Sequence, residues 1–89
     1  MMILVAERRI APRLPSSGPV EIFFDNPTPM SVHGELVETS ATGFRATHQC
    51  KTLEAGVEIA YAREGQAGRA RVVWTMVSGD RRVSGFMLL

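Results

Sequence analysis

The chain has 89 residues, of which 45% are hydrophobic and 21% charged, and its formal net charge at pH 7 is +1. These values describe one small globular domain and argue against a disordered chain or a second domain with its own cofactor-binding sheet. The near-zero charge differs from that of a protein that coats nucleic acid. The single cysteine, Cys50, excludes an internal disulfide framework and fits a reducing compartment.

The N-terminal run Met1–Ala6 is apolar but has no cationic region before it. It is too short for a signal peptide or a membrane span, and no other stretch approaches about 18 apolar residues. We therefore expect a cytoplasmic protein that makes no membrane contact.

Prolines at positions 12, 15, 19, 27 and 29 argue against a long helix in the first third of the chain. Segments rich in β-branched or alternating apolar residues indicate strands instead. Residues 51–56, which separate two of these segments, could form at most one helical turn. The expected strands are Val20–Phe24, Val32–Thr39, Phe44–His48, Val57–Ala62, Gly68–Val77 and Val83–Leu89.

The strongest strand signal is the alternation of Ala70, Val72, Trp74 and Met76, which predicts that all four side chains face the core. Six short strands with frequent turn signals predict an all-β fold, a small six-stranded antiparallel β-barrel with little or no helix. Closure would also hide the edges of so small a sheet. We expect residues 1–13 to form a flexible N-terminal arm and residues 14–89 a single barrel domain.

A basic cluster in the expected arm consists of Arg8, Arg9 and Arg13. Arginine side chains can bind a phosphodiester bidentately and stack on bases. A solvated basic segment would have the same composition, so the arginines alone do not establish a site.

A second candidate is the segment Glu38–Gly43, Glu-Thr-Ser-Ala-Thr-Gly, between two expected strands. Small hydroxylated residues that end in glycine suit a tight turn whose hydroxyl and N–H groups bind an anion or a base edge. An ordinary hairpin turn has the same composition. Arg45 and Arg71 could extend a phosphate-facing patch, although solvated strand positions also explain them.

Taken in order, these features resemble the PilZ domain. Its signature is Arg-x-x-x-Arg, matched here by Arg9 and Arg13, followed by (Asp/Asn)-x-Ser-x-x-Gly, in which Ser40 and Gly43 match and Glu38 does not. Two later stretches also look like strands of that family, so the resemblance covers about residues 7–89. These stretches are Gly68–Trp74 and Gly85–Leu88.

The resemblance implies a β-barrel receptor for the bacterial second messenger cyclic di-GMP. Arg9 and Arg13 would bind phosphates and guanine, Ser40 would contact the ligand, and Gly43 would permit the turn. Arg8 could hold a second ligand molecule. Such a domain is no enzyme, needs no cofactor besides its ligand, and passes the signal to an unidentified protein partner.

Glu38 departs from the family pattern, because its side chain is one methylene longer than the expected Asp. Its carboxylate can still accept from a guanine edge, but a displaced contact would lose roughly 1–2 kcal/mol. The alternative is an adaptor that binds protein but no nucleotide because of Glu38. The sequence runs only to Leu89, whereas a C-terminal helix often covers this barrel, so residues 1–6, a homodimer or a partner could cover it instead.

Other chemistry is poorly supported. His33, His48 and Cys50 lack the paired spacing of a four-ligand zinc site, so we expect no metal. Ser40, His48 and Asp80 have the residue types of a hydrolytic triad, but the sequence contains no nucleophile elbow, so we expect no such triad. A barrel that binds single-stranded nucleic acid needs aromatic platforms and a charged groove. With few aromatic residues and little net charge, we expect no DNA or RNA partner.

Overall fold

The computed structural model describes residues 14–25 and 28–89, and these residues form strands and turns without any helix. The all-β prediction is therefore confirmed, and each of the six expected strands is present, as β2 to β7. The strands are β1 (Leu14–Pro15), β2 (Pro19–Phe24), β3 (Met30–Thr39), β4 (Gly43–His48), β5 (Glu58–Arg63), β6 (Gln66–Ser78) and β7 (Arg81–Leu88).

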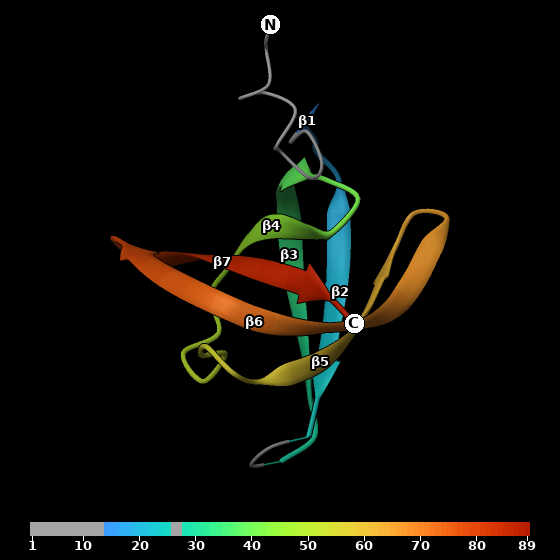
Figure 1. The fold of residues 1–89 in the computed structure, drawn as a ribbon. Helices are drawn as coiled ribbons and strands as arrows, with labels where there is room; N and C mark the ends of the chain where they lie inside the picture. Colours follow the sequence, from blue (N-terminus) through green and yellow to red (C-terminus); the bar gives the residue numbers. More distant parts are fainter. Residues whose placement is uncertain (1–13, 26–27) are drawn as a thin grey trace, which may run out of the picture.

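The six strands β2 to β7 close into an antiparallel barrel (Figure 1). Their order around the barrel is β3-β2-β5-β6-β7-β4, and β4 pairs back with β3 to complete the circle. The short strand β1 adds to β3, with Leu14 opposite Thr39. Among the residues described, none belongs to a helix with the length and hydropathy needed to cross a membrane.

Alternate side chains of the barrel strands fill the interior, together with Cys50 and Leu53 from the loop between β4 and β5. Burying a large aliphatic or aromatic side chain of this kind contributes roughly 1.5–3 kcal/mol. The buried apolar residues are Val20, Ile22, Phe24, Val32, Phe44, Ala46, Cys50, Leu53, Ile59, Tyr61, Ala70, Val72 and Phe86. Phe44 stacks on Phe86 with ring centroids 4.6 Å apart, which ties β4 to β7.

A β-bulge in β6 reverses the alternation that the sequence predicts there. Val72 lies opposite Phe86, but Trp74 lies opposite the next residue of β7, Gly85, so Val73 is the extra residue. An extra residue moves all later side chains to the other face of a strand. The prediction that Trp74 and Met76 belong to the core was therefore wrong: Trp74 lies on the outer face, and Met76 is 60% exposed.

A second bulge, in β3, has the same effect at Val37. Leu36 lies opposite the buried Ala46, and Glu38 lies opposite Arg45, whose side chain points outward. The two bulges re-aim one side chain each, Glu38 on β3 and Trp74 on β6, toward the outside of the same part of the barrel.

Candidate ligand-binding site

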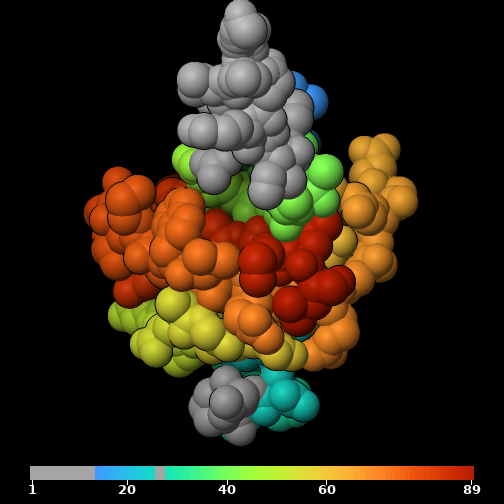
Figure 2. Space-filling model, in the orientation of Figure 1, coloured from blue at the N-terminus to red at the C-terminus, as the bar shows by residue number. Residues whose placement is uncertain are grey.

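The outer face of the barrel carries a row of four residues from four strands. Glu38 on β3 pairs with Arg45 on β4, Arg45 with Gly85 on β7, and Gly85 with Trp74 on β6. Figure 2 shows β6 and β7, in orange and red, side by side across the front of the molecule, with the green surface around the β3–β4 turn above them. Because each member of the row pairs with the next and Glu38 lies at the end of β3, the row reaches that turn.

Arg45 contacts both ends of this row. Its Nη1 lies 3.4 Å from Oε2 of Glu38, and its guanidinium carbon lies 5.3 Å from the centroid of the Trp74 ring. The side chains of Arg45 and Glu38 are 31% and 21% exposed, so solvent screens this ion pair only in part. A carboxylate, a guanidinium and an indole thus stand in line at the surface, which suits a ligand that is both planar and charged.

Gly85 leaves the space in which the Trp74 ring reaches Arg45. An added Cβ at Gly85 would collide with Nε1 and Cε2 of the indole. The Trp74 ring therefore lies over the backbone of β7, in space that any other residue at position 85 would occupy.

The β3–β4 turn at one end of the row is organised by Ser40. The Ser40 N–H donates to the Gly43 carbonyl at 2.9 Å, and the Ser40 hydroxyl accepts from the Thr42 N–H at 3.2 Å. Such a serine-centred turn holds its hydroxyl at the surface. At Gly43 a Cβ would run into the carbonyl oxygen of Phe86, so close packing against β7 demands glycine there.

The structure thus brings Glu38, Ser40 and Gly43 together at the β3–β4 turn. The predicted arm, residues 1–13, and its site residues Arg8, Arg9 and Arg13 lie outside the described residues. The sequence left Arg45 open as a patch residue and placed Trp74 in the core. Only the bulge at Val73 exposes the indole, and two adjacent apolar residues in a long alternating strand were the one available sign of it.

A second polar cluster lies inside the barrel around His48. Its Nδ1 accepts from the Cys50 N–H at 3.0 Å, so the neutral ring carries its proton on Nε2, which lies 2.7 Å from the Ser84 hydroxyl. Ser84 contacts Thr75 Oγ1 at 2.7 Å, and Thr75 donates to the Leu53 carbonyl at 3.0 Å. This chain joins β4, β7, β6 and the β4–β5 loop, and each polar group in it has a partner.

The His48 cluster lies in the interior of the barrel. Burial, and then the nearby charge of Arg82, lower the pKa of His48, so the neutral form that accepts from Cys50 is favoured. His48 and Ser84 are 4% and 0% exposed. Ser40, His48 and Asp80 do not form a triad, because His48 bonds to Ser84 while Ser40 lies at the far end of β4.

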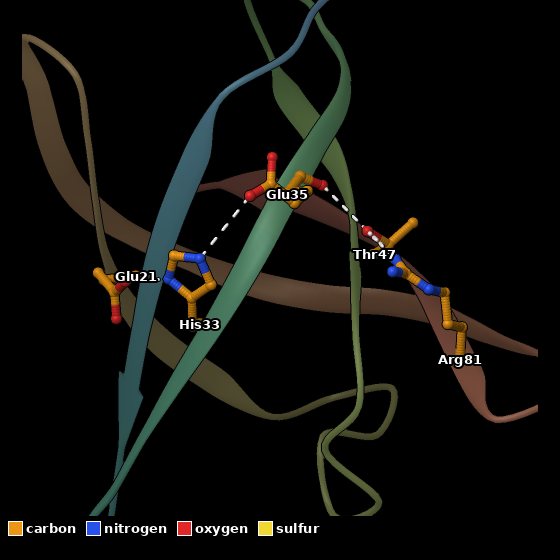
Figure 3. A network of polar contacts seen from close by, with 5 residues as sticks. All are labelled: Glu21, His33, Glu35, Thr47 and Arg81. Atoms are coloured by element: carbon orange, nitrogen blue, oxygen red, sulfur yellow. Dashed lines mark hydrogen bonds and ion pairs between the residues drawn. The ribbon is translucent and has the colours of Figure 1, made fainter.

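A third polar group covers the outside of β2, β3, β4 and β7 (Figure 3). The His33 ring bonds to Glu21 through Nδ1, and its Nε2 lies 3.7 Å from Glu35. Thr47 donates to the Glu35 carbonyl, and Arg81 donates to Thr47, both at 3.5 Å. The hydrogen bond and charge of Glu21, and then Glu35, raise the pKa of His33.

These positions separate the residues considered for a metal. His33 lies outside the barrel wall, while His48 and Cys50 lie inside it. Within residues 14–25 and 28–89, no three His, Cys, Asp or Glu side chains are grouped so as to hold a metal ion.

Compared with models of known protein families, the chain matches none, and no curated protein is significantly similar to it. Its function is therefore inferred from the residues and the geometry of the outer row.

Proposed function

We propose that this protein is a receptor for cyclic di-GMP that relays the level of this second messenger to a partner protein. The sequence resemblance to the PilZ domain suggests the ligand. The observation that carries the proposal is the outer row, in which Glu38, Arg45 and Trp74 stand beside the Ser40–Gly43 turn.

The chemistry of the row fits a guanine nucleotide. Guanine offers N–H donors on one edge and the acceptors O6 and N7 on another. The Glu38 carboxylate can accept from the donors, and the Arg45 guanidinium can donate to O6 and N7 or to a phosphate. The Trp74 indole offers a face on which a base can stack, a contact that contributes about 1–3 kcal/mol per base. The resemblance assigns the phosphates to Arg9 and Arg13.

The ion pair with Arg45 changes what Glu38, which stands where the family pattern has Asp or Asn, would do to a bound ligand. A lone carboxylate would repel the diester phosphates, but the guanidinium 3.4 Å away offsets much of that charge. The bulge at Val37 also aims the longer side chain along the outer face rather than into the barrel. Both features favour Glu38 as a working acceptor.

The alternative, an adaptor that binds no nucleotide, draws support from the same contacts. Arg45 is already engaged by Glu38 on one side and Trp74 on the other. If the ligand cannot displace these contacts, the row serves only to stabilise the surface.

Calorimetric titration with cyclic di-GMP decides between the two. We expect the wild-type protein to bind, and Arg9→Ala and Arg13→Ala each to lose about 2 kcal/mol, roughly 30-fold in affinity. Trp74→Leu should also weaken binding, through the lost stacking face. Arg81→Ala is the matched control, because Arg81 is an exposed arginine next to Thr47, and it should bind as the wild type does. A folded wild-type protein that releases no heat with the ligand would support the adaptor.

A further inference from the structure

Strand β6 extends beyond its neighbour β5. β5 pairs with β6 only as far as Arg71, and the turn before β5 adds two backbone bonds to Val72. From Val73 to Ser78, within the described part of the chain, β6 has a backbone ladder only to β7. Figure 1 shows this end of the β6–β7 pair extending past the other strands. An antiparallel strand paired on one side leaves alternate N–H and C=O groups open on the other.

The open stretch is also apolar. Val73, Met76 and Val77 are 52%, 60% and 62% exposed. No charged residue lies between Arg71 and Asp80, and the stretch contains no proline. Natural proteins usually blunt a solvent-exposed edge with lysine, proline or a bulge. Here the one bulge lies at the start of the stretch and leaves the rest regular.

We propose that this edge binds a second copy of the chain, so that residues 73–78 of two molecules pair antiparallel across a two-fold axis. An open edge is complementary to itself under that symmetry, since each molecule supplies the donors and acceptors that the other lacks. The absence of charge between Arg71 and Asp80 means that no like charges oppose each other in the paired stretch.

The charges at the two ends of the open stretch favour a second copy of the chain as the binding partner. The tip of the ribbon carries Arg81 and Arg82 against a single acid, Asp80. The other end of the stretch is bounded by the turn before β5, which carries the exposed Glu54. Antiparallel pairing brings the tip of each copy to that turn of the other, where arginine meets glutamate twice.

Two-fold pairing occupies the open stretch of both copies with each other, so association through it ends at two copies and gives a closed dimer. Trp74 lies within the paired stretch, on the outer face. The proposal stands apart from nucleotide binding, because it depends only on the open backbone edge and its charges.

Sedimentation velocity over a wide range of protein concentrations, without nucleotide, tests the proposal. We expect a monomer–dimer equilibrium for the wild type, and a dimer weakened roughly tenfold or more by Val77→Lys, since a lysine in the uncharged open stretch is the kind of side chain that blunts a strand edge. Met87→Lys is the matched control. It adds the same charge to another exposed apolar position, but β7 is paired on both sides there, so the dimer should persist.

A charge exchange identifies the orientation. Arg81→Glu alone should weaken the dimer, and adding Glu54→Arg in the same chain should restore it. A wild type that stays monomeric at all concentrations, an equal loss in Met87→Lys, or association that continues beyond two copies would each overturn the proposal. Circular dichroism of every variant verifies that the barrel remains folded.

Discussion

The Arg45 guanidinium lies over the Trp74 ring, with 5.3 Å between its carbon and the ring centroid, although the strands that carry the two residues are not neighbours. Strand β7 lies between them and contributes only Gly85 at that level. The contact between Arg45 and Trp74 therefore depends on the absence of a side chain at Gly85.

Gly85→Ala should disrupt the Arg45–Trp74 contact, because the new methyl group would occupy the place of the indole. Displacing a packed ring costs roughly 1–3 kcal/mol of unfolding free energy. Tryptophan fluorescence should shift to the red as the indole moves into water, and urea unfolding gives the free energy.

Arg45→Met is the comparison for Gly85→Ala. It removes the guanidinium but keeps an aliphatic side chain against the ring, so it should cost less, about 0.5–1 kcal/mol. If Gly85→Ala leaves both fluorescence and stability unchanged, the indole does not lie over position 85.

Substitutions of Glu38 distinguish an acceptor for guanine from a repelling charge. For a working acceptor, Glu38→Ala should weaken cyclic di-GMP binding by roughly 1–2 kcal/mol, since guanine donors lose their partner. Glu38→Asp should keep or improve the affinity. For a repelling charge, Glu38→Ala and Glu38→Gln should both improve binding, with a gain that shrinks as salt is added.

The affinity of these Glu38 variants is measured by calorimetry at two salt concentrations. Because Glu38→Ala also frees Arg45, the double variant Glu38→Ala with Arg45→Met separates the two effects.

The buried chain around His48 should contribute measurably to stability. Ser84→Ala leaves the buried His48 Nε2–H without its partner, which costs about 1–3 kcal/mol, while the Thr75 hydroxyl keeps its bond to the Leu53 carbonyl. Thr47→Ala is the comparison, because its hydrogen bonds lie on the exposed outer face. Urea unfolding should show a large loss for the first variant and a small one for the second.

The two histidines should give stability opposite dependences on pH. The lowered pKa of His48 means that the folded state binds fewer protons than the unfolded state, so its contribution is present above the ordinary value of 6.5 and is lost as pH falls through the folded pKa. The raised pKa of His33 means the reverse: its contribution is complete below 6.5 and is lost as pH rises through the folded pKa.

Urea midpoints across this pH range separate the two histidines. His48→Gln should flatten the loss of stability as pH falls below 6.5, while His33→Gln should abolish the loss of stability as pH rises above 6.5. A variant that shifts every midpoint equally would show that its histidine does not titrate differently in the two states.

Cys50 should be unreactive and dispensable for ligand binding. The thiol is buried and lies 3.4 Å from the Thr52 hydroxyl. Cys50→Ser should keep the affinity for cyclic di-GMP, and zinc chelators should leave the thermal melt unchanged. Thiol reagents should modify the folded protein far more slowly than the protein in urea. A melt that falls with chelator would point to a metal.

The sequence by itself determined the strands and the barrel. Period-two alternation, as in Ile59 and Tyr61, depends only on strand geometry, and turn residues such as Gly79 and Asp80 depend only on local backbone preferences. The turn residues Ser40 and Gly43 were predictable for the same reason. Because a chain of this composition must bury its alternating faces, six such strands left closure as the favoured arrangement.

The tertiary structure alone decided which side chains share the outer row. A bulge depends on the register between two strands, and two adjacent apolar residues, such as Val72 and Val73, do not say on which face the later side chains lie. It also decided that His48 meets Ser84, 36 positions along the chain. Such contacts require distant strands to close into one barrel, and local preferences contain no information about which residues then stand opposite each other.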